Sequence, residues 1–309
     1  MLFIFKKNVF IICLCFVYSP ILLANSHYLK KNILIVVSSK TTLYQQTIQS
    51  FEKNLLGNKN NQVTQLKYTR FNQKSLNNMD IVIALGKKAS LKVAQFDKKI
   101  PTIYALIPKV TLDKIKNCCQ LSSKEAAIFL DQPLLRQFNL LYEMFGSEPI
   151  TGLLFSDKTD QEQQKILDIA SQAKIQLNIV LVSKGKPIGY IIREKLKNSQ
   201  ALLAIPDPLI YNRENIYSIF LTTYSMRIPV IGYSNAMTKA GAILSLYSSP
   251  KDIGKQLADW FNSHDKDQHY REAPHYFHIS VNGSVARSLD IDLPKKELIL
   301  KKLKKNEQT

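Results

Sequence analysis

Cysteine, glycine and acidic residues are all scarce in this sequence. Its 309 residues include four cysteines and 10 glycines, and 24 acidic residues face 42 lysines and arginines, for a formal net charge of +18. So little cysteine excludes a disulfide scaffold, and so little glycine excludes a collagen. Hydrophobic residues make up 45% and charged residues 21%, close to the averages of globular proteins, so the chain is not fully disordered. The length is typical of about two domains.

Motifs for binding nucleic acid are also absent, although the positive charge would suit that function. The sequence contains no helix-turn-helix, zinc-finger or RNP pattern. Its lysines lie in scattered pairs, such as Lys30-Lys31 and Lys98-Lys99, or in the tail. We therefore interpret the charge as a lysine-rich solvated surface and expect no nucleic acid among the partners.

The one long hydrophobic run lies at the amino terminus. Lys6 and Lys7 precede an apolar run over residues 9–17, and small residues follow at 24–26. A positive start, a short apolar run and a small-residue cleavage site form a secretory signal peptide. The run is shorter than the ~20 residues that cross a membrane. We predict a cleavable signal peptide over residues 1–26 and a periplasmic protein, with an uncleaved anchor as the alternative.

Only Cys118 and Cys119 remain after that cleavage. Adjacent cysteines form only a strained disulfide, and no Cys-x-x-Cys or Cys/His spacing suits structural zinc. We interpret them as an incidental pair in a polar surface loop over residues 113–124, and we expect no cofactor.

The rest of the sequence alternates between apolar runs and amphipathic segments. Apolar runs followed by helices are typical of a parallel sheet covered on both faces. Because this rhythm occurs twice, we predict an α/β fold of two doubly wound parallel-sheet lobes with a hinge and an interlobe cleft. The predicted strands are residues 32–39, 62–69, 80–86, 101–107, 151–156, 177–183, 201–207 and 229–234, and the predicted helices are 41–56, 87–95, 133–145, 159–173, 188–197 and 213–225.

A series of ordered segments resembles a known family. The segments are residues 81–89 (IVIALGKKA), 100–105 (IPTIYA), 130–133 (LDQP), 203–208 (LAIPDP), 222–234 (TTYSMRIPVIGYS), 240–250 (AGAILSLYSSP) and 281–294 (VNGSVARSLDIDLP). They resemble bacterial ABC-transporter substrate-binding proteins of the TrpX-like family, which have the type I periplasmic binding protein fold. The chain looks closer to an orphan branch of that family.

The resemblance implies two lobes joined by three crossovers. Lobe one would comprise residues 27–126 plus 241–270, and lobe two residues 127–240 plus 271–294, followed by a basic tail over 295–309. Relatives close around a small ligand and dock on an ABC permease in the inner membrane, and characterised ones are associated with aromatic amino acids. We expect a monomeric, non-enzymatic solute-binding protein whose ligand is an amino acid or an aromatic compound.

The tail mixes apolar residues with six lysines. This pattern predicts a short amphipathic basic helix that packs on its own lobe or, alternatively, contacts a membrane.

Parallel sheets bind ligands beyond the carboxyl ends of their strands, which points to five residues in lobe one. Ser39 and Thr42 follow the first strand, where helix amides favour an anion such as a carboxylate. After the third strand, Gly86 permits close backbone approach and Lys87 adds a charge. Tyr104 ends the fourth strand and offers a ring and a hydroxyl. The alternatives are helix capping for Ser39 and Thr42, a solvated charge for Lys87 and a core position for Tyr104.

Five residues of lobe two have the corresponding positions. Asp157 and Asp207 follow strands and can pair with an ammonium group. Tyr211 lies shortly after Asp207, and Tyr233 and Ser234 follow the last strand of this lobe. The alternatives are helix capping for the two aspartates and a turn without ligand contact for Tyr233 and Ser234.

Two other functions have weaker support in the sequence. Residues 232–236 approximate the Gly-x-Ser-x-Gly elbow of hydrolases around Ser234, with Asp252, Asp259 and His264 following, but no substantial helix is expected directly after the strand. A metal site is the second alternative, because imidazole and carboxylate groups crowd one segment at irregular spacing. Its residues are His264, Asp265, Asp267, His269, His275 and His278.

A third alternative keeps the fold and changes the role. The protein would then report ligand occupancy to a membrane sensor instead of feeding a permease, and the sequence does not separate the two.

Overall fold

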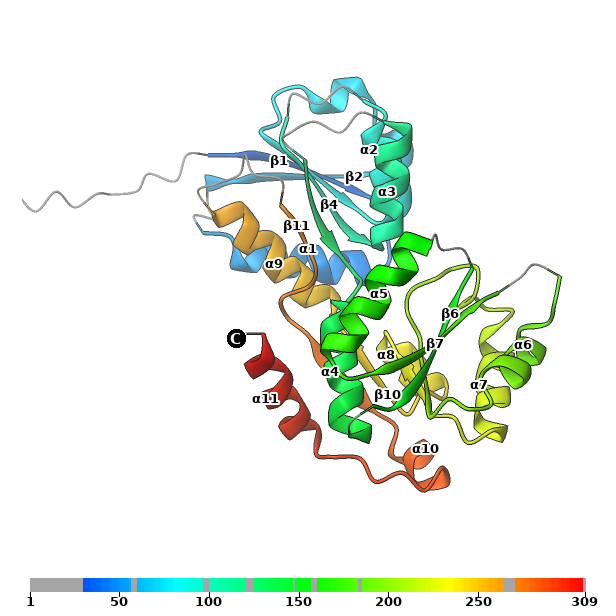
Figure 1. Ribbon diagram of the computed structural model, residues 1–309. Coiled ribbons are helices and arrows are strands. Elements are labelled where there is room, and N and C mark those ends of the chain that lie inside the picture. Colours follow the sequence, from blue (N-terminus) through cyan, green and yellow to red (C-terminus); the bar gives the residue numbers. More distant parts are fainter. Residues whose placement is uncertain are drawn as a thin grey trace, which may run out of the picture.

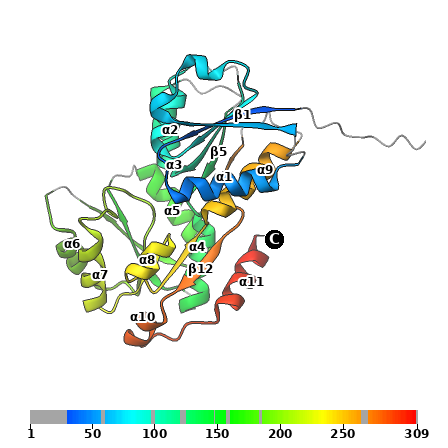
Figure 2. The same cartoon turned by 180° about the vertical axis from the view of Figure 1, so that it is seen from behind.

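The structure is a computed structural model that describes residues 30–56, 60–96, 100–119, 125–146, 148–156, 160–182, 185–263 and 270–307. Its strands form two separate sheets of six strands each, with helices on both faces of each sheet (Figure 1 and, from behind, Figure 2). The predicted α/β fold of two doubly wound lobes is therefore confirmed.

The first lobe is built mainly from the amino-terminal half of the chain. Its strands are β1 (Asn32–Val37), β2 (Gln62–Lys67), β3 (Ile81–Leu85), β4 (Thr102–Ile107), β5 (Glu125–Phe129) and β11 (Arg271–Glu272). Its helices are α1 (Thr42–Asn54), α2 (Lys87–Ala94), α3 (Lys109–Cys118) and α9 (Pro250–Asn262), with short 3-10 turns η2 (Tyr68–Arg70) and η3 (Gln73–Leu76). The sheet order is β11-β5-β4-β3-β1-β2, and these pairings are parallel.

The second lobe repeats this design. Its strands are β6 (Ile150–Phe155), β7 (Gln176–Leu181), β8 (Ala201–Leu203), β9 (Val230–Gly232), β10 (Leu244–Tyr247) and β12 (His278–Val281). Its helices are α4 (Leu134–Phe145), α5 (Asp160–Gln172), α6 (Ile188–Lys195), α7 (Ile216–Ser225), α8 (Asn235–Ala240), α10 (Gly283–Ser288) and α11 (Lys296–Asn306). The order is β12-β10-β9-β8-β6-β7, and β12 runs antiparallel to β10 at the edge.

Burial on both faces explains the unbroken apolar runs of the central strands. In β1, Ile33 and Ile35 contact the core beneath α1 and α9, whereas Leu34 and Val36 contact the core beneath α2 and α3. All four are at most 1% exposed. Because side chains alternate along a strand, every position must be apolar only when both faces of the sheet are covered.

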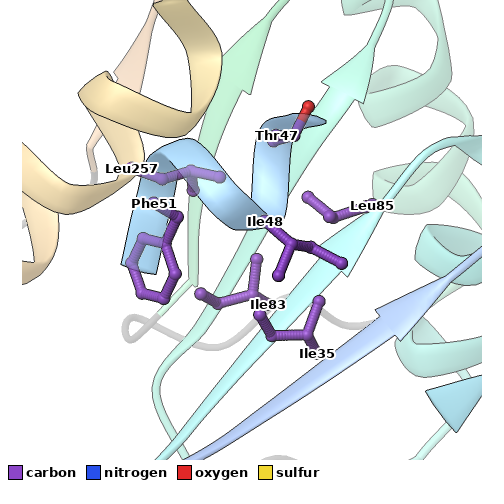
Figure 3. Close-up of a pocket in the computed structure, with 7 residues that line it drawn as sticks. All are labelled: Ile35, Thr47, Ile48, Phe51, Ile83, Leu85 and Leu257. Atoms are coloured by element: carbon purple, nitrogen blue, oxygen red, sulfur yellow. The ribbon is translucent and has the colours of Figure 1, made fainter. Parts of the chain in front are cut away.

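A narrow gap remains in the core of the first lobe between α1, α9 and the sheet (Figure 3). The gap has no room for a water molecule, and its one polar side chain, Thr47, donates to the carbonyl oxygen of Leu43 at 3.1 Å. It is therefore a feature of core packing, not a ligand site. The lining residues are Ile35, Thr47, Ile48, Phe51, Ile83, Leu85 and Leu257.

Helix α3 differs from the prediction of a polar loop over residues 113–124, and strand β5 is an additional strand that the sequence did not predict. The helix extends to Cys118 because Leu112 and Ile115 recur at helical spacing on a buried face, and its polar residues conceal that pattern. Cys118 is the last residue of α3 and Cys119 its C-cap, so the pair ends a helix instead of lying in a loop. Within the described residues, neither Cys118 nor Cys119 forms a disulfide, and Cys118 is exposed.

The chain crosses between the lobes three times. It passes from β5 to α4 through residues 130–133, from β10 to α9 through 248–249, and from β11 to β12 through 273–277.

Sheet membership differs from the predicted lobe boundaries at three places. Residues 127–129 and Arg271–Glu272 belong to the first sheet, and Leu244–Tyr247 belongs to the second. Hydrogen bonding to distant strands decides which sheet a strand joins, and the local sequence pattern does not reveal those partners.

The carboxyl-terminal helix α11 packs against the second lobe. Ile299 and Leu303 are each 1% exposed and belong to the core cluster of this lobe, whereas the lysines of the helix are exposed. Lys302 pairs with Glu143 of α4. The predicted amphipathic helix is thus present and lies on its own lobe. Throughout the described ranges, no helix combines the length and apolarity needed to cross a membrane.

We expect Gly254→Ala to destabilise the first lobe. Gly254 lies where α9 contacts α1, and a Cβ atom there would stand 2.3 Å from the backbone oxygen of Thr47. Because the obstacle is backbone, the two helices must separate, and overpacking of this kind costs about 1–3 kcal/mol. Denaturant unfolding measures the effect. Lys251→Ala, on the exposed side of the same helix, is the control, and equal stability of the two variants would contradict the close contact between α1 and α9.

Candidate functional site

The carboxyl ends of the parallel strands carry most of the residues predicted to bind a ligand. In Figure 1 the strands of the first sheet end on the side of that lobe that faces the second lobe. Helix α5 begins on the side of the second lobe that faces the first (Figure 1). Parallel sheets bind ligands at such edges because loops and helix N-termini converge there.

Ser38 organises the edge of the first lobe at the ends of β1 and β3. Its hydroxyl donates to the carbonyl oxygen of Leu85 at 3.0 Å and accepts from the backbone N–H of Ala89 at 2.9 Å. The second bond satisfies an N–H in the first turn of α2, so a residue from a neighbouring strand caps this helix. The sequence did not predict this cap, because a cap supplied by another strand leaves no local signal.

Gly86 allows a close approach at the start of α2. Its φ of 84° favours glycine, and its N–H donates to the carbonyl oxygen of Ala105 at 2.9 Å. A Cβ atom would lie 2.3 Å from Tyr44 Oη and 2.8 Å from Ser38 Oγ. Tyr44 of α1 therefore belongs to this edge, and only the fold reveals it.

Ser39, Thr42 and Lys87 lie on the same edge. Ser39 is partly buried, and Thr42 and Lys87 are exposed. The N-cap of α1 is Thr41, whose side chain makes no capping hydrogen bond. Neither Ser39 nor Thr42 is therefore the cap of α1, the alternative role considered for them.

Tyr104 lies in the core instead of at a strand end. Strand β4 continues to Ile107, and Tyr104 is 0% exposed among the apolar side chains beneath α2 and α3. Its hydroxyl donates to Glu125 Oε1 at 2.8 Å. Burial, followed by the nearby Glu125 carboxylate, raises the pKa of Tyr104, so its hydroxyl remains protonated. This placement corresponds to the alternative core role and differs from the predicted ligand contact.

Asp207 connects two strands of the second lobe at their carboxyl ends. Its Oδ2 accepts from the backbone N–H of Ser156 at 2.9 Å and from the Ser156 hydroxyl at 2.8 Å, while Oδ1 accepts from the N–H of Leu209 at 3.0 Å. Ser156 follows β6, and Asp207 follows β8, which ends at Leu203. The carboxylate is thus held in one orientation by three donors. Asp157, the other predicted carboxylate, lies outside the described residues.

Tyr211 and Tyr233 form an aromatic pair beside this carboxylate. Their ring centroids are 6.0 Å apart with the rings at 80°, an edge-to-face contact. The pKa of Tyr211 is raised mainly by burial and, to a smaller extent, by the nearby Tyr233 and Asp207. The pKa of Tyr233 is raised mainly by burial and, to a smaller extent, by Asp207. Tyr211 Oη is buried without a hydrogen-bond partner within the described part of the chain. The fold therefore brings Asp207, Tyr211 and Tyr233 together.

Residues 33–301 match the family described as ABC transporter substrate binding protein. The chain belongs to this family. The resemblance predicted from the sequence is thereby confirmed. No curated protein matches the sequence significantly.

Solved structures share the fold of this substrate-binding protein. The ABC domain in complex with L-Trp from Streptococcus pneumonia is 16% identical with a TM-score of 0.57, and the match covers 87% of this chain and 98% of that one. The ligand-free, open structure of CD0873, a substrate binding protein with adhesive properties from Clostridium difficile, is 13% identical with a TM-score of 0.68, and the match covers 86% and 97%. At these identities the likeness establishes the fold, that of type I periplasmic binding proteins.

The hydrolase pattern is not assembled by the described residues of this substrate-binding protein. Ser234 is the N-cap of α8, a helix of six residues, and its hydroxyl accepts from the N–H of Met237 at 3.2 Å. Asp252 instead contacts His278, at 2.8 Å. Asp259 accepts from the Tyr276 hydroxyl at 2.9 Å, and His264 lies outside the described residues. A hydrolase elbow needs a substantial helix directly after the strand, and the sequence predicted that none follows here. The six-residue helix α8 agrees with that prediction.

The predicted metal segment falls mainly on residues that are not described. His275 and His278 are described, and His278 Nε2 lies 2.8 Å from Asp252 Oδ2. Among the described residues, no group of three or more His, Cys, Asp or Glu side chains could hold a metal ion. The other members of the segment, His264, Asp265, Asp267 and His269, lie outside the described residues.

We expect Ser38→Ala to lower stability and Ser39→Ala to leave it unchanged. Loss of the Ser38 hydroxyl leaves a buried N–H of α2 without its cap, at a cost of about 1–2 kcal/mol. Ser39 has no such role, so its variant should remain within about 0.5 kcal/mol of the parent. Thermal and denaturant unfolding measure both. A stable Ser38→Ala protein would contradict the cross-strand cap.

Proposed function

We propose that this substrate-binding protein captures a small zwitterionic or aromatic molecule, such as an amino acid, between its two lobes. The observation that carries the proposal is the Tyr211–Tyr233 pair beside Asp207 at the strand ends of the second lobe. Tyrosine rings pack against apolar or aromatic groups, and a carboxylate pairs with an ammonium group. The structure solved with L-Trp supports this ligand class through the shared fold.

The edge of the first lobe offers the complementary chemistry. Ser39, Thr42 and Lys87 lie beside the N-terminal ends of α1 and α2, where backbone N–H groups and a positive charge favour a carboxylate. A ligand with an ammonium and a carboxylate would contact both lobes at once, and this contact would favour a closed arrangement. Ser234 and, outside the described residues, Asp157 remain proposed contacts.

We further propose that the protein is exported by the predicted signal peptide and delivers its ligand to an ABC permease of the inner membrane as a monomer without enzymatic activity. Membership in the substrate-binding family supports this role. The sensing alternative is distinguished by the neighbouring genes. A permease and an ATPase beside this gene would support uptake, and a sensor kinase alone would support signalling.

A thermal-shift screen of residues 27–309 tests the ligand class. The panel contains amino acids including L-tryptophan, aromatic metabolites, nucleosides and divalent metals. A ligand at 100 times its dissociation constant stabilises the folded protein by about 2.7 kcal/mol, which gives a readily measured shift. We expect stabilisation by one class of amino acid or aromatic compound. A shift with metals alone would contradict the proposal and favour the histidine segment.

Tyr211→Phe should separate binding from stability. The substitution keeps the ring and removes a hydroxyl that has no hydrogen-bond partner within the described part of the ligand-free chain. Stability should therefore stay the same or rise, while affinity for the stabilising ligand falls about 2- to 10-fold, the effect of one hydrogen bond. Calorimetric titration measures the affinity.

The matched control is Tyr104→Phe, which removes a hydroxyl bonded to Glu125 in the core. This variant should lose about 1 kcal/mol of stability and keep its affinity. If Tyr211→Phe lost stability and kept its affinity, while Tyr104→Phe lost affinity, Tyr211 would lie outside the site. Asp207→Ala is a less selective test, because it also removes the bonds to Ser156 and Leu209.

A further inference from the structure

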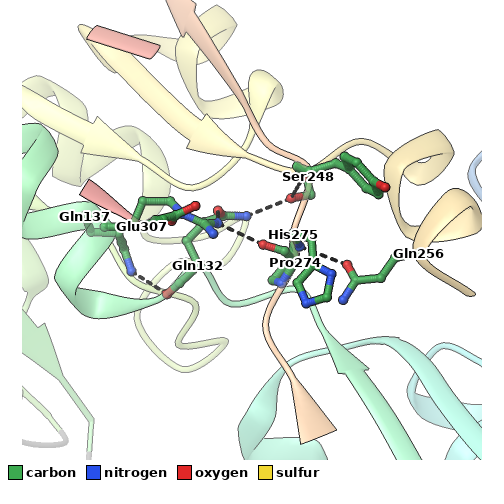
Figure 4. Close-up of polar contacts among 9 residues, drawn as sticks. Gln132, Gln137, Ser248, Gln256, Pro274, His275 and Glu307 are labelled. Atoms are coloured by element: carbon green, nitrogen blue, oxygen red, sulfur yellow. Dashed lines mark hydrogen bonds and ion pairs between the residues drawn. The ribbon is translucent and has the colours of Figure 1, made fainter. Parts of the chain in front are cut away.

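Hydrogen bonds join the three crossings between the lobes (Figure 4). Gln132 lies in the first crossing, Ser248 in the second and Tyr276 in the third. Gln132 Nε2 donates to Ser248 Oγ at 2.9 Å, and Ser248 Oγ donates to the carbonyl oxygen of Tyr276 at 2.5 Å. All three segments that can bend when the lobes move are therefore connected in series.

Arg136 of α4 binds two of these crossings. Its Nη1 donates to Gln132 Oε1 at 2.6 Å and to the carbonyl oxygen of Pro274 at 2.9 Å, and its guanidinium lies 4.1 Å from the centre of the Phe277 ring. The side chain is only 6% exposed. A charge so far removed from water is costly unless an opposite charge and hydrogen bonds compensate it.

The compensating charge comes from the carboxyl-terminal end of the described chain. Glu307, directly after α11, accepts from Arg136 Nε across 171 residues of sequence. Ile299 and Leu303 hold α11 on the second lobe and so bring Glu307 to the crossings. The helix thus supplies the counter-ion of the arginine.

Gln256 of α9 fixes the same region to the first lobe. It is 0% exposed, and its Oε1 accepts from the N–H of His275 at 2.9 Å while its Nε2 donates to the carbonyl oxygen of Ala273 at 3.1 Å (Figure 4 draws Gln256 and His275). The third crossing is therefore held from the first lobe by Gln256 and from the second by Arg136.

We propose that Arg136 is a positioning residue that sets the relative orientation of the two lobes, and that the carboxyl-terminal helix controls it through Glu307. The inference rests on the proposed function, because the orientation of the lobes matters for affinity only if the ligand lies between them. Hydrogen bonds of a buried guanidinium are strong and directional, unlike apolar packing. With the arginine in place, the first and third crossings are tied directly to each other, and without it they are joined only through Ser248.

Distance measurements between spin labels on the two lobes test this inference without any ligand. One label is placed at Gln49→Cys on α1 and the other at Lys239→Cys on α8, both exposed, with Cys118 and Cys119 replaced by serine. We expect a narrow distance distribution in the parent protein. Arg136→Gln and Glu307→Gln should broaden or shift it, because losing one charged hydrogen bond changes a population ratio about tenfold or more.

Lys302→Ala is the matched control. It removes the ion pair with Glu143 from the same helix, but both partners belong to the second lobe and neither touches a crossing. Its distance distribution should equal that of the parent protein.

If Arg136→Gln fails to fold, Glu307→Gln decides the outcome. This variant should fold, because Glu307 is 35% exposed and the apolar anchors of α11 remain in place. If the distance distributions of Arg136→Gln and Glu307→Gln equal that of the parent protein, the proposal is overturned. The Arg136–Glu307 ion pair is then a purely structural contact, even if the melting temperature falls. If Lys302→Ala broadens the distance distribution as well, the proposal is also overturned. Any weakening of α11 would then loosen the lobes, with no special role for the Arg136–Glu307 pair. Since no ligand is added, this result is independent of the ligand screen, and the failure of either proposal can be recognised separately.

Discussion

Each parallel sheet of this protein must be covered by helices on both faces, and much of the architecture follows from that requirement. The first sheet is completed by α9 and β11, which come from far along the chain, and its two faces are buried beneath different pairs of helices. The second sheet likewise takes β12 and α11 from the carboxyl-terminal segment. The chain therefore has to cross between the lobes repeatedly, and each crossing exposes backbone that needs hydrogen-bond partners.

The same constraint determines where ligand chemistry can lie. Parallel strands place their carboxyl ends on one edge, so residues separated by 50 or more positions meet there, as Ser38 meets Ala89 and Ser156 meets Asp207. Many polar groups at these edges are used to hold the edge itself. Asp207 accepts three hydrogen bonds within its lobe, and Ser38 and Ser234 cap helices. Tyr211 is different, because its hydroxyl is buried without a partner in the described part of the chain.

The crossings combine two opposing demands. They must bend if the lobes move, yet a buried charge at Arg136 requires a fixed set of partners around it. The chain meets both demands by drawing those partners from two of the crossings and from the end of the carboxyl-terminal helix. The basic amphipathic tail, which the sequence presents as a surface feature, thus has a structural connection to the region between the lobes through Glu307.

The sequence by itself determined the fold class, because burial on two faces produces apolar runs such as Ile33–Val37 whatever their partners are. It also predicted that Gly86, Asp207, Tyr211 and Tyr233 lie at the carboxyl edges of the sheets, since each residue lies in a segment that follows a strand. It did not predict α3, whose apolar spacing is masked by polar neighbours, and it also did not predict strand β5 or the core position of Tyr104. Only the tertiary structure decided which sheet β10 and β11 join, that Ser38 caps α2, and that Glu307 pairs with Arg136. The reason is physical: burial periodicity is a local property of the chain, whereas strand partners, caps in trans and counter-ions depend on contacts between residues far apart in sequence.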